Sequence, residues 1–81
     1  MKVRVKLFAA AKELAGRDEL EIDVPASATI ADARAAVVAA LPALDRIVAH
    51  SVWAVGAEYV HDNTPLTETS DIALIPPVSG G

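Results

Sequence analysis

The sequence predicts one α+β domain in which a mixed sheet of about five strands packs on one main helix. Three observations support this prediction. A chain of 81 residues is the length of one small domain. Two early segments alternate apolar with charged residues, as half-buried strands do. One later stretch, followed by three strand-like segments, carries apolar residues at helical spacing instead.

The two N-terminal strands are expected over residues 2–8 and 19–24, and the simplest arrangement pairs them antiparallel. In the first strand Leu7 belongs to the face that should pack against the helix, together with two valines. Phe8 follows on the opposite, open face. Because side chains alternate along a strand, this assignment places Leu7 in the core and leaves Phe8 accessible.

Two helical segments follow from propensity and end signals. Residues 9–15 are rich in helix formers, and Gly16 stands where a left-handed residue closes a helix. The main helix is expected over residues 29–41, with Thr29 as N-cap and Asp32 near the positive end of the helix dipole. It ends before a proline, which cannot continue it.

The second half of the chain predicts one more helical turn and three short strands. Residues 44–48 suggest the helical turn, and residues 52–55 and 58–60 predict strands joined by a tight Gly-Ala turn. Residues 61–70 have the composition of a loop. Residues 72–75 are continuously apolar, as expected of a central strand with both faces covered.

This order of elements predicts a β-grasp sheet holding one helix. The first and last strands are the most apolar, so we expect them side by side and parallel. Phe8, Ala73 and Ile75 would then form an exposed apolar patch where the last strand ends. Exposed apolar clusters commonly mark partner surfaces.

The last residues predict an extended tail, so we divide the chain into a domain over 1–75 and a tail over 76–81. Pro76 and Pro77 favour extended geometry. From Pro77 to Gly81 the chain can reach roughly 16 Å at ~3.3 Å per residue. Gly80 and Gly81 present no side chain to a narrow channel, so we expect the tail to carry a carboxylate into the active site of another protein.

Composition excludes several kinds of chemistry. The absence of cysteine rules out disulfides, thiolate metal sites and a nucleophilic thiol on this chain. His50 and His61 stand alone in sequence, without a second ligand at zinc-like spacing, so no metal site is expected. A small domain also leaves little room for a catalytic cavity of its own. No apolar run is long enough to cross a membrane, and we expect a cytoplasmic protein.

Charge is divided unevenly along the chain. Residues 1–46 hold all seven Lys and Arg residues, whereas residues 47–81 hold only acidic charges. A nucleic-acid partner is therefore not expected. Two interpretations remain open for the acidic half, namely attraction to a basic pocket on a partner protein and an ordinary solvated surface.

Three stretches resemble the small sulfur-carrier subunits of molybdopterin synthase. They are Leu7-Phe8-Ala9-Ala10-Ala11-Lys12-Glu13-Leu14-Ala15-Gly16, Pro65-Leu66, and Ala73-Leu74-Ile75-Pro76-Pro77-Val78-Ser79-Gly80-Gly81. The last is the most specific, and the resemblance covers nearly the whole chain. It implies a ubiquitin-like β-grasp fold whose C-terminal glycine is adenylated by an ATP-using activating enzyme and becomes a thiocarboxylate. The carrier binds no cofactor itself.

The resemblance also implies partners and site residues. In that family the tail enters a large catalytic subunit within a heterotetramer, where its sulfur builds the dithiolene of molybdopterin from cyclic pyranopterin monophosphate. The reacting residue corresponds to Gly81, preceded by Gly80. Partner contacts correspond to these positions: Phe8, Tyr59, Ile75, Pro76, Pro77, Val78 and Ser79.

Two departures and two other function classes accompany this resemblance. Thr69-Ser70 replaces a usual Gly-Asp turn, and a positive φ there would strain a threonine. Gly56 replaces a usual asparagine. One other class is a sulfur carrier for thiamine or another pathway, or a ubiquitin-like protein modifier, and the second is a plain interaction module. A plain module would not need a free terminal carboxylate.

Overall fold

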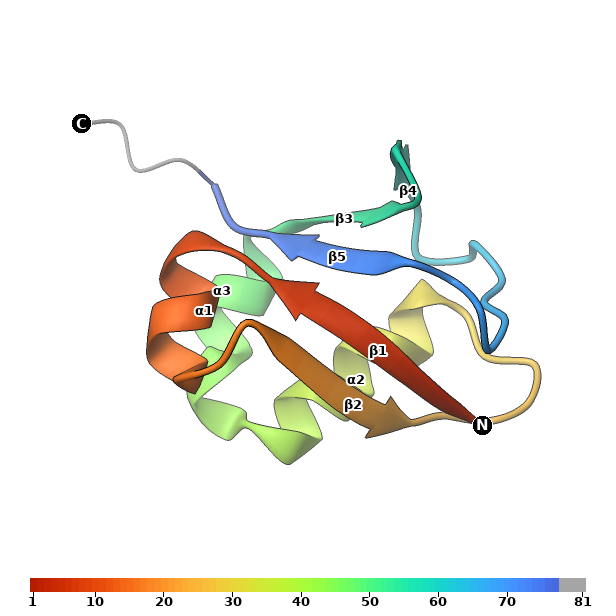
Figure 1. The fold of residues 1–81 in the computed structure, drawn as a ribbon, viewed down its shortest axis with the longest axis horizontal. Helices are drawn as coiled ribbons and strands as arrows, with labels where there is room; N and C mark the ends of the chain where they lie inside the picture. The colour runs from red at the N-terminus through yellow and green to blue at the C-terminus, as the bar shows by residue number, and fades with distance from the viewer. Residues whose placement is uncertain (78–81) are drawn as a thin grey trace.

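The computed structural model describes residues 1–77 and places a five-stranded mixed sheet against helices that cover one of its faces (Figure 1). The strands are β1 (Lys2–Leu7), β2 (Glu19–Asp23), β3 (Val52–Val55), β4 (Glu58–Val60) and β5 (Ile72–Ile75). The helices are α1 (Ala9–Ala15), α2 (Ile30–Ala40), the 3₁₀ turn η1 (Pro42–Leu44) and α3 (Asp45–Ala49). The predicted α+β class and β-grasp arrangement are confirmed.

The sheet order is β2-β1-β5-β3-β4. Only β1 and β5 pair in parallel, with Leu7 opposite Leu74, whereas the other three strand pairs are antiparallel. The last strand is therefore an inner strand beside the first, as its continuous apolar sequence predicts. Parallel neighbours finish at the same edge of the sheet, so Phe8 and the end of β5 lie together.

The core lies between the sheet and the helices. Leu7 is 1% exposed, which confirms the predicted alternation of β1. From β5, Ile72 and Leu74 enter the same core, and α2 contributes its buried face. Burial of this kind stabilises the fold by roughly 25 cal/mol per Å² of apolar surface.

The helix ends follow local chemistry. Gly16 closes α1 in the left-handed conformation at φ 72°, as predicted, and its N–H donates to the Lys12 carbonyl. At the start of α2 the Thr29 N–H donates to the Asp32 carboxylate at 2.9 Å, which satisfies one of the donors that a helix start leaves free. The helical segment before β3 is longer than the single predicted turn, because Pro42 begins a 3₁₀ turn that continues directly into α3.

The turn at Thr69-Ser70 forms without a left-handed residue. The Ser70 N–H donates to the Thr67 carbonyl at 3.1 Å, and the Thr67 N–H donates to the Ser70 hydroxyl at 2.9 Å. Side-chain hydrogen bonding of this kind builds a turn without positive φ. The strain expected at Thr69 is therefore absent. Gly56 occupies the β3–β4 turn at φ 64°, which glycine adopts readily.

Folding redistributes the charges that the sequence separates. Asp62 pairs with Arg34, and Asp71 pairs with Lys6 at 3.3 Å, so two of the four late acidic residues meet cations of the first half. Asp71 also precedes β5, at the end of that strand away from Pro76. The acidic residues therefore do not gather where the tail begins, and the solvated-surface interpretation fits them better.

Candidate functional site

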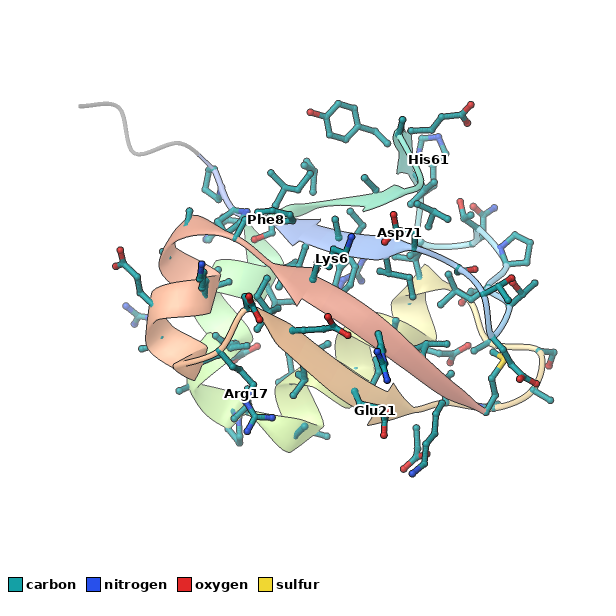
Figure 2. The ribbon with its side chains drawn as sticks, viewed as in Figure 1. Lys6, Phe8, Arg17, Glu21, His61 and Asp71 are labelled. Carbon is teal, nitrogen blue, oxygen red and sulfur yellow. The ribbon has the colours of Figure 1, made fainter. Side chains whose placement is uncertain are left out.

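The place where the last strand ends forms a groove that we call the tail-root groove. Its volume is about 490 Å³. The lining residues come from the β1–α1 junction and from the end of β5: Phe8, Ala9, Ala10, Glu13, Ile75, Pro76 and Pro77. Phe8 lies beside the end of β5 (Figure 2). Residues at opposite ends of the sequence thus form one surface, as the parallel pairing of the first and last strands predicts.

An apolar patch extends from this groove across the open face of the sheet. We define the apolar patch as the strand residues that face away from the helices together with Phe8, which directly follows β1. Its members are Phe8, Val52, Ala54, Tyr59, Ala73 and Ile75. Register joins them, since Val52 faces Ile75, and Ala54 faces both Ala73 and Tyr59. The predicted grouping of Phe8, Ala73 and Ile75 is present, and the patch is wider than predicted.

Three side chains make the patch accessible. Phe8 is 46% exposed, Val52 50% and Tyr59 75%. Tyr59 lies on β4, three strands away from β1 in the sheet order, which is about 14 Å at ~4.8 Å per strand. The patch is therefore broad enough to meet a protein surface rather than a single side chain.

Val52 and Ala54 are the patch residues that sequence reasoning missed. Residues 52–55 are all apolar, so alternation gives no direct sign of which face each side chain takes. Trp53 determines which face each β3 side chain takes, because it is 4% exposed and belongs to the core cluster. Its neighbour Val52 consequently faces outward. Assigning the tryptophan to the core would have found Val52.

The backbone around Phe8 is unusual. Phe8 is extended at φ −127° and ψ 157°, and Ala9 then adopts φ 51°, the only positive φ of a non-glycine residue within 1–77. A left-handed alanine costs about 1 to 2 kcal/mol, so the surrounding packing must hold this turn. The consequence is a sharp change of direction between β1 and α1 that leaves the Phe8 ring at the surface.

The neighbouring part of the open face has a different character. Lys2, Arg4 and Lys6 project from β1 and pair with Glu21, Glu19 and Asp71, respectively, at 3.3 to 3.6 Å. These exposed pairs contribute little to stability, with typical values of about 0 to 1 kcal/mol each. They do neutralise one another, so this part of the face carries no strong field for a partner.

The predicted tail residues divide at Pro77. Pro76 is buried against the domain, whereas Pro77 is exposed, so Pro76 anchors the chain and Pro77 is the first accessible residue after β5. Val78, Ser79, Gly80 and Gly81 lie outside the described residues, and their predicted roles stay predictions. The division into 1–75 and 76–81 stays a prediction as well.

The histidines do not assemble a metal site. Within residues 1–77 no three His, Asp or Glu side chains come close enough to hold an ion. His50 follows α3 and His61 follows β4, so they belong to different parts of the fold. In the same range no helix is long and apolar enough to span a membrane.

Comparison with known proteins shows which family this chain belongs to. The ThiS family matches residues 5–81, which is almost the entire chain. The chain belongs to the ThiS family. Over its full length it is 37% identical to the molybdopterin synthase sulfur carrier subunit of Chlamydomonas reinhardtii, all of which is covered. The Arabidopsis thaliana protein of the same name is 32% identical over the whole chain and 84% of its own length.

Several solved structures have the same fold as this chain. SAMP1 from Haloferax volcanii superposes with a TM-score of 0.89 at 34% identity, with both chains fully covered. A chain in the complex of subunits 1 and 2 of the molybdopterin-converting factor from Helicobacter pylori gives a TM-score of 0.71 at 26% identity, again with both chains fully covered. The proteins that this chain resembles therefore include both sulfur carrier subunits and a protein named as a small archaeal modifier.

Proposed function

We propose that this ThiS-family chain is the sulfur carrier subunit of a molybdopterin synthase. The observation that carries the proposal is the match to the Chlamydomonas reinhardtii protein of that name, which covers the whole of both chains. The exposed patch beside the last strand supports it, because a carrier must dock on partners while it presents its tail.

In this proposal Gly81 is the reacting residue. A carboxylate is a poor electrophile, so an ATP-dependent adenylating enzyme first joins the Gly81 carboxylate to AMP and releases pyrophosphate. Sulfur from a donor then displaces AMP, which is a good leaving group, and leaves a thiocarboxylate. The chain itself supplies only the acyl group, in keeping with its lack of cysteine.

The acceptor in this proposal is cyclic pyranopterin monophosphate held by the large subunit. In each transfer the thiocarboxylate sulfur forms a carbon–sulfur bond on the pterin in place of a carbon–oxygen bond. Water then hydrolyses the carbon–sulfur bond to the carrier's acyl group, so the carrier leaves with its carboxylate. Two transfers supply the two sulfurs of the dithiolene. The apolar patch and Pro77 provide the docking surface, and a heterotetramer of two carriers and two large subunits is the expected assembly.

Intact-protein mass spectrometry tests the proposal. The chain is incubated with the adenylating enzyme, ATP and a sulfur donor, and it should gain the mass difference of sulfur for oxygen in its C-terminal peptide. Addition of the large subunit and the pterin precursor should remove that mass and produce molybdopterin. Deletion of Gly81 shortens the reach by roughly 3.3 Å and should abolish transfer, because misplacement of about 1 Å already lowers rates about 100-fold.

Protein modification is a second candidate, favoured by the likeness to the Haloferax volcanii small archaeal modifier protein 1. Both functions begin with the same adenylate, and they differ in the group that attacks. A protein lysine would form an isopeptide bond, whereas the pterin would take only sulfur. The same assay separates them, since conjugates retain the whole chain mass. Discharge only to a thiamine-pathway acceptor would instead assign the chain to that pathway.

A further inference from the structure

A second groove borders the tail root on the side away from the apolar patch, and we call it the α3 groove. Its volume is about 270 Å³. It is lined by residues of α1, of α3 with the residue that follows it, and of the tail root: Ala10, Arg46, Ile47, His50, Pro76 and Pro77. Arg46 and His50 provide its polar side chains, and no acidic residue lines it. The groove is therefore apolar, with cationic or neutral polar groups beside it.

Arg46 has no carboxylate partner among the described residues. The ion pairs formed within 1–77 use Lys2, Arg4, Lys6 and Arg34, and Arg46 is exposed. It is also the last Lys or Arg of the sequence. The cations on the open face are thus paired within the domain, whereas Arg46 beside the tail root has no carboxylate partner within residues 1–77 and can pair with a carboxylate of a partner protein.

The two grooves adjoin each other. Ala10, Pro76 and Pro77 line both of them, so the chain leaves the domain with a groove on either side. A partner that takes an extended tail into a channel must surround the point where the tail leaves the body. Its rim then meets the apolar patch on one side and the α3 groove on the other.

From this arrangement we propose that the large subunit's docking surface continues around the tail root onto α3. There an apolar side chain of the large subunit fills the α3 groove, and a neighbouring carboxylate pairs with Arg46. The inference rests on the proposed function. A groove of 270 Å³ falls below the ~300 to 1,000 Å³ of small-molecule sites, which favours a protein side chain as its occupant.

The test compares two charge reversals with the same change in net charge. Arg46→Glu should weaken binding to the large subunit about tenfold or more, since like charges placed together at an interface are strongly unfavourable. Arg17→Glu is the matched control, because Arg17 is exposed, forms no ion pair within 1–77, and lies far from Phe8 and the end of β5 (Figure 2). Its affinity should stay within about twofold of wild type. Thermal melts establish that both variants fold.

Conservative and compensating changes identify the partner group. Arg46→Lys should retain most of the affinity, and Arg46→Gln should reduce the dependence of affinity on salt, as expected for loss of one exposed charge pair. Reversing Asp or Glu residues one at a time around the large subunit's channel should restore binding of Arg46→Glu for one of them. Equal affinities of the two charge reversals would overturn the inference, whether both bind normally or both weaken.

The wild-type measurement separates this inference from the proposed function. If the wild-type chain binds the large subunit and Arg46→Glu binds as well, only the α3 contact is wrong. If the wild-type chain fails to bind a competent large subunit, the proposed function is wrong and the α3 contact falls with it.

Discussion

Two adjacent residues, Leu7 and Phe8, illustrate how the surface is made. Leu7 is 1% exposed and Phe8 is 46% exposed, although both are large and apolar. The difference arises from the alternation of a strand, in which a shift of one residue exchanges the two faces. The register of β1 on β5 therefore decides both what holds the domain together and what it offers to a partner.

Truncation of Leu7 tests the core side of this pair. Leu7→Ala should lower the free energy of unfolding by about 2 to 5 kcal/mol, through lost burial and the cavity left behind. Urea denaturation measures the change. Leu14→Ala serves as control, since Leu14 is 52% exposed and its truncation should alter stability by no more than about 0.5 kcal/mol. Similar losses in both variants would contradict the assigned core.

Charges placed in the patch test its role in docking. Phe8→Glu and Val52→Lys should each leave unfolding nearly unchanged but weaken binding to the large subunit by at least about tenfold, because a charge would be buried in an apolar contact. Isothermal titration calorimetry measures the affinity. Leu14→Glu, an exposed apolar position outside the patch, should bind normally. Normal binding by both patch variants would remove the patch from the interface.

The sequence predicts the open-face positions of Phe8 and Ile75 well and those of other patch residues poorly, for physical reasons. The clean alternation of apolar and charged residues in β1 shows which side chains of that strand face the helices. Because β5 pairs with β1, this also indicates which β5 side chains lie on the open face. The outward orientation of Val52 is not predicted, because its strand is uniformly apolar. The left-handed conformation of Ala9 and the burial of Pro76 are not predicted from the sequence either. Both are imposed by packing between segments distant in sequence and leave no local pattern.

At the scale of elements, the end signals of the helices were more predictable than their lengths. Gly16 and Thr29 carry local chemistry that acts on their own backbone, so they end or begin helices wherever the chain folds. The length of the segment from η1 through α3 depends instead on burial of Leu44 and Val48 in the core. Tertiary contacts of this kind extend helices beyond their intrinsic propensity.

The start of α2 provides a test at this scale. Asp32→Ala removes the acceptor of the Thr29 N–H bond and a negative charge near the helix start, and it should lower stability by about 0.5 to 2 kcal/mol. Asp32→Asn keeps an acceptor and removes only the charge, so its loss should be smaller. Thermal denaturation at low salt gives both values. A larger loss in the asparagine variant would contradict the assigned hydrogen bond.

For the whole molecule, stability and activity are expected to reside in different residues. Pro76 is the last buried residue within 1–77, whereas the proposed reacting residue is Gly81. Deleting residues 78–81 should therefore change the free energy of unfolding by less than about 0.5 kcal/mol while abolishing thiocarboxylate formation. Denaturation and mass spectrometry on one sample measure the two properties. A large loss of stability would show that the last residues belong to the folded core.

The parallel pairing of β1 with β5 also has a mechanical consequence. The N-terminus begins β1 at one end of the sheet, and β5 leads out at the opposite end (Figure 1). A pull that separates the two ends therefore slides these strands along each other. Their hydrogen bonds, and those between β5 and β3, resist together rather than opening one at a time. A force applied between the N-terminus and the end of β5 is therefore resisted by both strand pairs at once.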